Sequence, residues 1–130
     1  MVGVGEEPGE MTLYTPVYKG YPLPALSSLA AEDAGDLTGR GMFVRSFDEQ
    51  YLKLAAQKVK IIRIDDLEVN PILVKIDIEG GEMAALRGMK ETLKRSRPAV
   101  IVEMHKREIP EMKTFMTGLD YDLIDSEEMR

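Results

Sequence analysis

The amino-acid sequence predicts an α/β protein whose sheet is mostly parallel. In the second half of the chain, two apolar segments rich in β-branched residues, 72–78 and 99–104, flank a segment with helical spacing. A second helical segment and another short apolar segment follow. Alternation of strand and helix is typical of βαβ units, whose right-handed crossovers connect parallel strands.

Length and composition agree with a single domain over residues 1–130. The chain has 130 residues, 44% of them hydrophobic, which is enough to form a core. It has no cysteine, which excludes disulfides and thiolate metal sites. The net charge of -6 argues against general binding to nucleic acids or anionic membranes. No stretch is long and apolar enough for a membrane span, and no signal peptide is visible, so we expect a cytoplasmic protein.

The first third of the chain is predicted to contain two strands and a long connection. Residues 1–5 indicate a short strand that runs into a turn. Residues 10–17 alternate as a half-buried strand does, and Pro16 is expected to end it. Residues 18–42 are rich in Gly, Pro, Ser and Asp, which predicts an irregular connection.

A helix and a strand are predicted next. Ser46 and Glu49 have the spacing of a capping box, and apolar side chains then recur on one helical face. These signals predict a helix over residues 47–58. Residues 59–64 predict a strand that ends before two aspartates.

The second half carries the strongest patterns. Residues 72–78 are almost continuously apolar, which is typical of a parallel strand covered on both faces. Residues 82–97 place four apolar side chains at helical spacing, which predicts one helix ending at a proline. The four are Met83, Leu86, Met89 and Leu93.

Three further elements complete the expected order. Residues 99–104 predict a second buried strand. Residues 109–117 indicate a short helix that Gly118 closes, and residues 121–125 indicate a third strand. Strand, helix, strand, helix and strand would together form the parallel sheet.

Polar side chains follow the first two of these strands. In parallel sheets, ligands bind beyond the carboxyl ends of the strands. Asp77 and Glu79 lie at one such end, and Glu103 and His105 lie at the next. Strand alternation puts each pair on one face, and adjacent strands are about 5 Å apart, so we expect the four side chains to converge. Gly80 with Gly81 would allow a tight turn that exposes backbone N–H groups.

Simpler interpretations of these residues stay open. An acid such as Glu82 is common in the first turn of a helix, and Glu79 can have the same role. His105 is the sole histidine and can be a solvated side chain. Three carboxylates and a histidine could hold a divalent cation, but no ligand spacing is diagnostic, so no metal is predicted. Asp77 and Glu103 are harder to dismiss, because each follows a run of apolar residues.

A glycine-rich segment near the start imitates a dinucleotide-binding motif. The segment "GVGEEPG" has the spacing Gly-x-Gly-x-x-x-Gly instead of Gly-x-Gly-x-x-Gly. Almost no strand precedes it, and a proline and two acids crowd the loop. We therefore reject a phosphate-binding role for this segment.

The segment "LVKIDIEGGEMAALRGMKETLKRSRPAVIVEMH" resembles the FkbM family of S-adenosylmethionine-dependent methyltransferases. The matching positions are Lys75 to Glu82, Leu86, Gly88, Pro98, Glu103 and His105. Gly81 departs from the small alanine that is usual there. Upstream, "IIRIDDL", "LSSLA" and "VGVGEEPGEMTLYTPVYKG" also resemble family segments, so the likeness covers nearly the whole chain.

The resemblance implies a Rossmann-like methyltransferase fold that transfers a methyl group from S-adenosylmethionine, usually to an oxygen of a small molecule or sugar. Asp77 would lie near the reactive end of the cofactor. Glu79, Glu103 and His105 would line the acceptor pocket, with His105 or a carboxylate as the general base.

One departure from the family concerns the cofactor. Family members carry a glycine-rich turn and an acid-ended strand upstream, and the 130 residues contain neither. We therefore expect the fold to be incomplete, S-adenosylmethionine to bind weakly or not at all, and an exposed apolar sheet edge to allow self-association. Three functions stay open: an incomplete methyltransferase domain, a non-catalytic remnant that acts as a binding module, and an unrelated α/β hydrolase that uses the strand-end acids.

Overall fold

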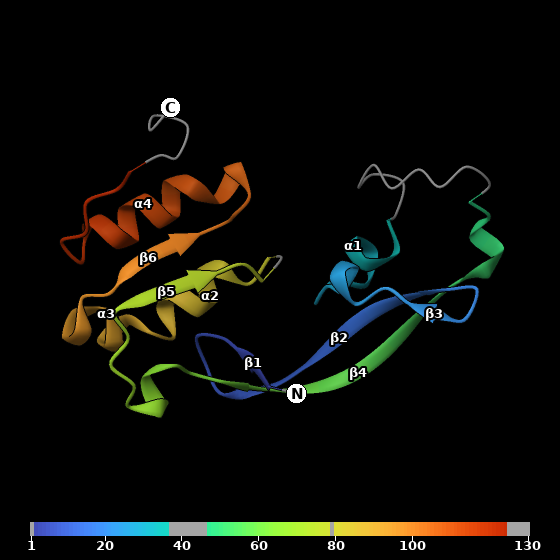
Figure 1. Cartoon of the computed structure of the whole chain (residues 1–130), viewed down its shortest axis with the longest axis horizontal. Coiled ribbons are helices and arrows are strands. Elements are labelled where there is room, and N and C mark those ends of the chain that lie inside the picture. The colour runs from blue at the N-terminus through green and yellow to red at the C-terminus, as the bar shows by residue number, and fades with distance from the viewer. Residues whose placement is uncertain (1, 37–46, 79, 125–130) are drawn as a thin grey trace. The chain divides into compact units, whose positions relative to one another are not determined.

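The structure, a computed structural model, describes residues 2–36, 47–78 and 80–124 (Figure 1). Contacts divide the chain into two compact units: Met1–Gly3 with Gly9–Ile61, and Val4–Pro8 with Ile62–Arg130. The α/β class is confirmed. The mostly parallel sheet is not found, because the described strands form a four-stranded sheet with antiparallel pairs and a separate parallel pair. No helix within the described ranges is long and apolar enough to cross a membrane.

The four-stranded sheet has the strand order β1-β4-β2-β3. Its strands are β1 (Val2–Val4), β2 (Gly9–Tyr18), β3 (Tyr21–Pro22) and β4 (Leu52–Ile62). Both early strands of the sequence analysis are confirmed, but Pro16 does not end β2. The carbonyl of Pro16 accepts a hydrogen bond from Leu23 N at 2.8 Å, so its nitrogen faces away from β4. The missing N–H therefore removes no bond from the β2–β4 ladder.

Short elements occupy the connection after β2. A 3-10 helix at Pro24–Leu26 and α1 (Ala31–Gly35) follow β3. The described part of the expected irregular connection therefore contains one short strand and two short helices. Ala34 in α1 and Ser28 before it are buried.

The helix expected over residues 47–58 is wrong. A helical turn is present only as a 3-10 helix at Glu49–Tyr51, and β4 then begins at Leu52. Each residue of β4 from Leu52 to Ile61 has an antiparallel partner on β2. This pairing satisfies the backbone groups that the two strands direct toward each other, and it overrides the helical spacing of the apolar side chains. Ser46 of the expected capping box lies outside the described residues.

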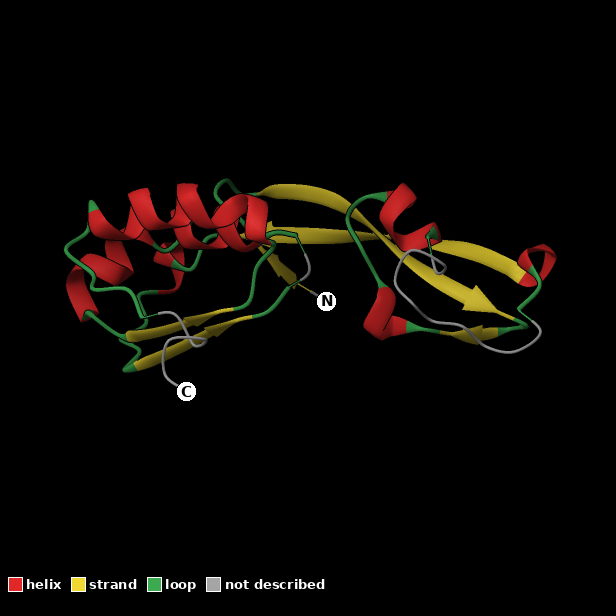
Figure 2. Ribbon diagram, turned by 90° about the horizontal axis from the view of Figure 1, so that it is seen from above, coloured by secondary structure: helices red, strands yellow, loops and turns green. Residues whose placement is uncertain are grey.

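The second unit is built on two parallel strands, β5 (Leu73–Ile76) and β6 (Ala99–Val102). Its helices are α2 (Glu82–Arg87), α3 (Lys90–Ser96) and α4 (Ile109–Thr117), and Figure 2 shows them on one side of these strands. The expectation that both faces are covered is wrong, because Leu73 is 56% exposed and Ile101 is 51% exposed. The inward-facing side chains pack with the helices in one core.

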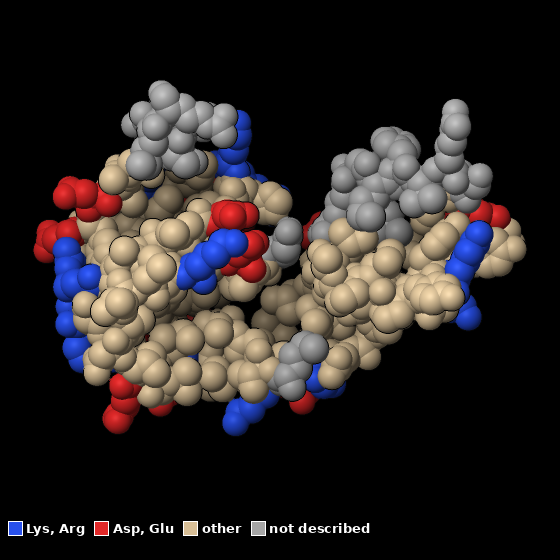
Figure 3. Space-filling view, viewed as in Figure 1, with Lys and Arg blue, Asp and Glu red and all other residues tan. Residues whose placement is uncertain are grey.

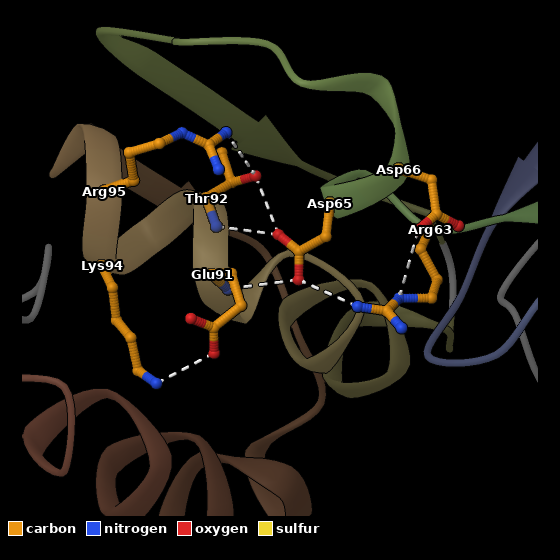
Figure 4. A network of polar contacts seen from close by, with 7 residues as sticks. All are labelled: Arg63, Asp65, Asp66, Glu91, Thr92, Lys94 and Arg95. Carbon is orange, nitrogen blue, oxygen red and sulfur yellow. Dashed lines mark hydrogen bonds and ion pairs between the residues drawn. The ribbon is translucent and has the colours of Figure 1, made fainter.

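The helix expected over residues 82–97 is two helices with a break at Gly88. The carbonyl of Gly88 accepts a hydrogen bond from Asp65 N at 3.0 Å. The carboxylate of Asp65 in turn accepts hydrogen bonds from Thr92 N at 2.8 Å and Glu91 N at 3.1 Å, in the first turn of α3 (Figure 4). Asp65 therefore supplies the cap that starts a new helix.

The apolar face of the two helices is buried as predicted. Leu86 and Leu93 are fully buried, and Met83 and Met89 lie in the same cluster. A glycine is required at position 88, because a Cβ atom there would lie 2.0 Å from the Gly5 carbonyl oxygen. Close approach of residues 4–8 to α2 thus depends on this glycine.

The end of the described chain confirms one element and corrects another. Helix α4 ends at Thr117 with Gly118 as its C-cap, as predicted. The third strand expected over residues 121–125 is wrong for its described part, since residues 121–124 form no strand. The Tyr121 hydroxyl donates to the Leu93 carbonyl at 3.2 Å, and Arg97 donates to the carbonyls of Leu119 and Asp120. These contacts bind the segment to the end of α3 instead of to β6.

Candidate functional site

Two of the predicted site residues meet at the carboxyl ends of the parallel strands. Asp77 follows β5, and Glu103 follows β6. Lys75, on β5, joins them: its Nζ lies 2.8 Å from Asp77 Oδ2 and 3.5 Å from Glu103 Oε1. We call these three residues the Lys75 cluster. All three side chains are partly exposed, and Figure 3 shows a small group of acidic and basic side chains amid uncharged surface on the viewed face.

The charges of the cluster support one another. The hydrogen bond to Asp77, followed by the negative charges of Asp77 and Glu103, raises the pKa of the Lys75 ammonium above its usual value. Lys75 is therefore fully charged at neutral pH. Two carboxylates around one ammonium leave the cluster more negative than positive, which favours a cationic ligand group nearby.

Of the other two predicted residues, the structure describes only His105, and no ion pair or hydrogen bond joins its side chain to this cluster. Glu79 lies outside the described residues. His105 precedes the 3-10 helix Lys106–Glu108, and its carbonyl accepts a hydrogen bond from Glu108 N at 2.9 Å. Its side chain is exposed and makes no hydrogen bond or ion pair within the described part of the chain. The functional role of all four residues stays a prediction.

The loop between β5 and α2 has a structural explanation. Gly80 has φ of 105°, a conformation that favours glycine, and its N–H donates to both oxygens of Glu82 at 3.1 Å. Glu82 is buried and also accepts a weaker hydrogen bond from Ile78 N at 3.4 Å. The interpretation of Glu82 as a first-turn acid is therefore supported. The sequence analysis expected the turn to expose its backbone N–H groups. The Gly80 N–H instead donates to Glu82 and is not available to a ligand.

A pocket of about 380 Å³ lies beside β5 within the second unit. Its lining is Val4, Ile64, Val69, Pro71, Leu73, Val74, Lys75, Ile76, Ile78, Ala85 and Met89. Lys75 is the one charged residue of this lining, and no lining side chain carries a hydroxyl, amide or carboxylate group. The pocket is therefore suited to apolar groups and not to the polar groups of a nucleoside.

Sequence reasoning did not single out Lys75 as a bridge between the two acids. The signal was a lysine two residues before Asp77, because alternation places positions 75 and 77 on one face of a strand. It also missed Asp65, whose capping role depends on a helix distant in sequence. Within the described ranges, no three His, Asp or Glu side chains are grouped as a metal site.

The comparison with protein families decides the class. The family model described as the Methyltransferase FkbM domain matches residues 2–123 of the 130-residue chain. This chain belongs to the FkbM methyltransferase family. The match covers both units, so the resemblance on residues 73–105 and the segments upstream of it is confirmed. Comparison with curated proteins and with solved structures found no match.

Proposed function

We propose that this protein transfers a methyl group from S-adenosylmethionine to an oxygen atom of a small molecule or sugar. The observation that carries the proposal is the match of the FkbM methyltransferase family to residues 2–123. The parallel pair β5 and β6 would be the part of a Rossmann-like sheet whose strand ends carry the reacting groups.

The Lys75 cluster supports the assignment of the strand ends as the reaction site. In the proposal, Asp77 faces the reactive end of the cofactor, while Glu103, His105 and Glu79 line the acceptor pocket. A sulfonium is a cation, and the net negative charge of the cluster fits it. Apart from Lys75, the side chains that line the pocket beside β5 offer no polar partner for the ribose, so we expect the cofactor to bind weakly or not at all.

The proposed chemistry needs one proton to leave the acceptor hydroxyl. The cofactor, when bound, would supply the methyl group. Glu103 or His105 would accept the hydroxyl proton as general base, and both are exposed enough to reach an acceptor. Lys75 would hold the two carboxylates at a fixed separation through its contacts with Asp77 and Glu103. The remaining contribution would be alignment of the hydroxyl oxygen for in-line attack.

Transfer of labelled methyl groups tests the proposal. The purified chain is incubated with methyl-labelled S-adenosylmethionine at about 1 mM, so that weak binding does not hide turnover. A panel of sugars and small hydroxyl compounds serves as acceptors, and labelled products are identified by mass. Acceptor-dependent labelling above the rate of boiled protein is the expected result. Its absence for every acceptor would oppose the methyltransferase activity and support the alternative below.

The alternative is a non-catalytic binding or interaction module of the same family. The apolar lining of the pocket beside β5 favours it, because that lining resembles a contact surface more than a cofactor site. In this case S-adenosylmethionine should have no measurable affinity. An acceptor sugar or a protein partner should still bind.

A further inference from the structure

One edge of strand β5 has backbone groups with no partner among the described residues. Ile72 and Ile76 accept hydrogen bonds from Ala99 N and Glu103 N, both at 3.0 Å, so their carbonyls face β6. Because backbone groups alternate along a strand, the N–H and C=O groups of Leu73 and Lys75 point to the opposite edge. In the described part of the chain, β5 pairs with β6 alone, which leaves that opposite edge open.

The surface beside this open edge is apolar. Val69, Leu73 and Ile78 line the pocket of about 380 Å³ and are among the exposed large apolar side chains. A strand added to β5 would direct alternate side chains into this pocket while its backbone bonds to Leu73 and Lys75. Open edges of this kind are templates for pairing with another chain.

The charges along β5 select the kind of strand that fits. Lys75 and Asp77 are two residues apart and carry opposite charges. When two such strands run antiparallel with Ile76 opposite Ile76, each Lys75 lies opposite an Asp77. The same register puts Val74 opposite Ile78, both apolar and both at the pocket. A two-fold interface requires this self-complementarity, whereas an unrelated strand has no reason to match it.

We propose that β5 pairs antiparallel with β5 of a second copy of this chain, with Lys75 opposite Asp77 of the partner subunit. The pairing joins two two-stranded sheets into one of four strands. It fills the pocket beside β5 with apolar side chains of the other copy. The proposal is independent of the methyltransferase activity, because it depends on the backbone edge, the pocket and the charge order.

Sedimentation equilibrium of the full chain tests the pairing. Measurements at about 5 to 500 μM protein should show a monomer–dimer equilibrium whose dimer fraction rises with concentration. A chain that stays monomeric over this range overturns the proposal and leaves the edge to another occupant.

Charge exchanges test the register. Lys75→Glu puts two acids opposite each other at both ends of the pairing, and Asp77→Lys does the same with two lysines, so each should weaken dimerisation about tenfold or more. The double variant Lys75→Glu with Asp77→Lys restores opposite charges and should return most of the affinity. Lys58→Glu is the matched control, because Lys58 pairs with Glu10 in the other unit.

Each single variant also loses the ion pair between positions 75 and 77 of its own chain. The double variant and a folding measurement distinguish this loss from the loss of contacts between the two copies. Circular dichroism and urea unfolding should show folded protein for each variant. A dimer that neither single variant weakens overturns the proposal. So does a folded double variant that remains as weak as the single ones.

Discussion

The carboxylate of Asp65 accepts hydrogen bonds from both the backbone N–H and the side-chain hydroxyl of Thr92, each at 2.8 Å. Asp65, which precedes β5, thus caps α3, which follows α2. The cap holds the chain before β5 against the start of α3. Arg63 adds a contact to the same carboxylate at 3.4 Å (Figure 4). Lys75 and Asp77 of the Lys75 cluster lie within the segment that this cap encloses, whereas Glu103 follows it.

Removal of this cap should destabilise the protein. Asp65→Ala leaves the N–H groups of Glu91 and Thr92 without their acceptor, and the Asp65 side chain is only 7% exposed. We expect a loss of about 2–3 kcal/mol in the free energy of unfolding, measured in urea. Asp66→Ala is the matched control and should change it by less than about 1 kcal/mol, because Asp66 is 53% exposed and only 4.0 Å from Arg63. Equal losses for the two variants would contradict the capping role.

The same carboxylate should make stability depend on acid pH. Burial alone would raise the pKa of Asp65, but the hydrogen bonds from Thr92, Glu91 and Arg63 together hold it below its ordinary value of 3.8. The ionised group therefore stabilises the fold above that ordinary pKa, and the stabilisation is lost as the pH falls toward the lower folded-state pKa. Between about pH 6 and pH 3, the free energy of unfolding should fall more steeply for the wild type than for Asp65→Asn. Parallel pH profiles would show that Asp65 has the same pKa in the folded and unfolded chain.

A methyl group at position 88 should not fit. The added Cβ of Gly88→Ala would lie 2.0 Å from the Gly5 oxygen, a backbone atom that cannot rotate away. We expect a loss of about 3 kcal/mol or more in the free energy of unfolding. Gly9→Ala is the matched control, since its Cβ would meet nothing within 4 Å. Its effect should stay within about 0.5 kcal/mol.

Patterns that depend on local burial were predictable from the sequence. The apolar face of α2 and α3, the helix α4 with its glycine cap, and the parallel pairing of β5 with β6 all follow from periodicity and chain order. The break at Gly88 was not predictable in this way. It depends on Asp65 and Gly5, whose contacts with α2 and α3 exist only in the folded chain.

The wrong assignments have a common cause. Residues 52–58 carry both helical and alternating spacing, and the pairing with β2 decides between them. Residues 121–124 have the composition of a strand, but Tyr121 and Arg97 bind that region to the end of α3. A strand needs a partner as well as a pattern, and neither case shows its partner in the local sequence.

The candidate site was predictable to the extent that it depends on strand order. The carboxyl ends of two parallel strands bring Asp77 near Glu103, which alternation and topology imply. That Lys75 bridges them could not be read from the acids alone. The position of His105 depends on the turn after β6, a feature that no periodicity describes.

Truncation of a side chain on the buried face of α2 should destabilise the protein. Leu86 is fully buried in the core of the second unit, so Leu86→Ala should cost about 2–5 kcal/mol in urea unfolding. Leu67→Ala makes the same chemical change at a side chain that is 50% exposed, and it should cost less than about 1 kcal/mol. A loss below about 0.5 kcal/mol for Leu86→Ala would mean that this face is solvated.

Cofactor affinity and methyl transfer should respond differently to changes at the strand ends. We expect calorimetric titration of the chain to give a dissociation constant for S-adenosylmethionine well above about 10 μM, because each polar contact that the apolar pocket does not supply costs about 1 kcal/mol. A value at or below about 10 μM would contradict this expectation.

Asp77→Asn should weaken binding further, because in the proposal the Asp77 charge faces the sulfonium. Glu103→Gln and His105→Ala should leave the affinity nearly unchanged, and loss of a general base should lower the rate of methyl transfer by about 10²-fold or more. Glu10→Gln, an exposed acid of the other unit, is the matched control for Glu103→Gln. Wild-type transfer rates in both Glu103→Gln and His105→Ala would remove these residues from the proposed reaction while leaving the family assignment intact.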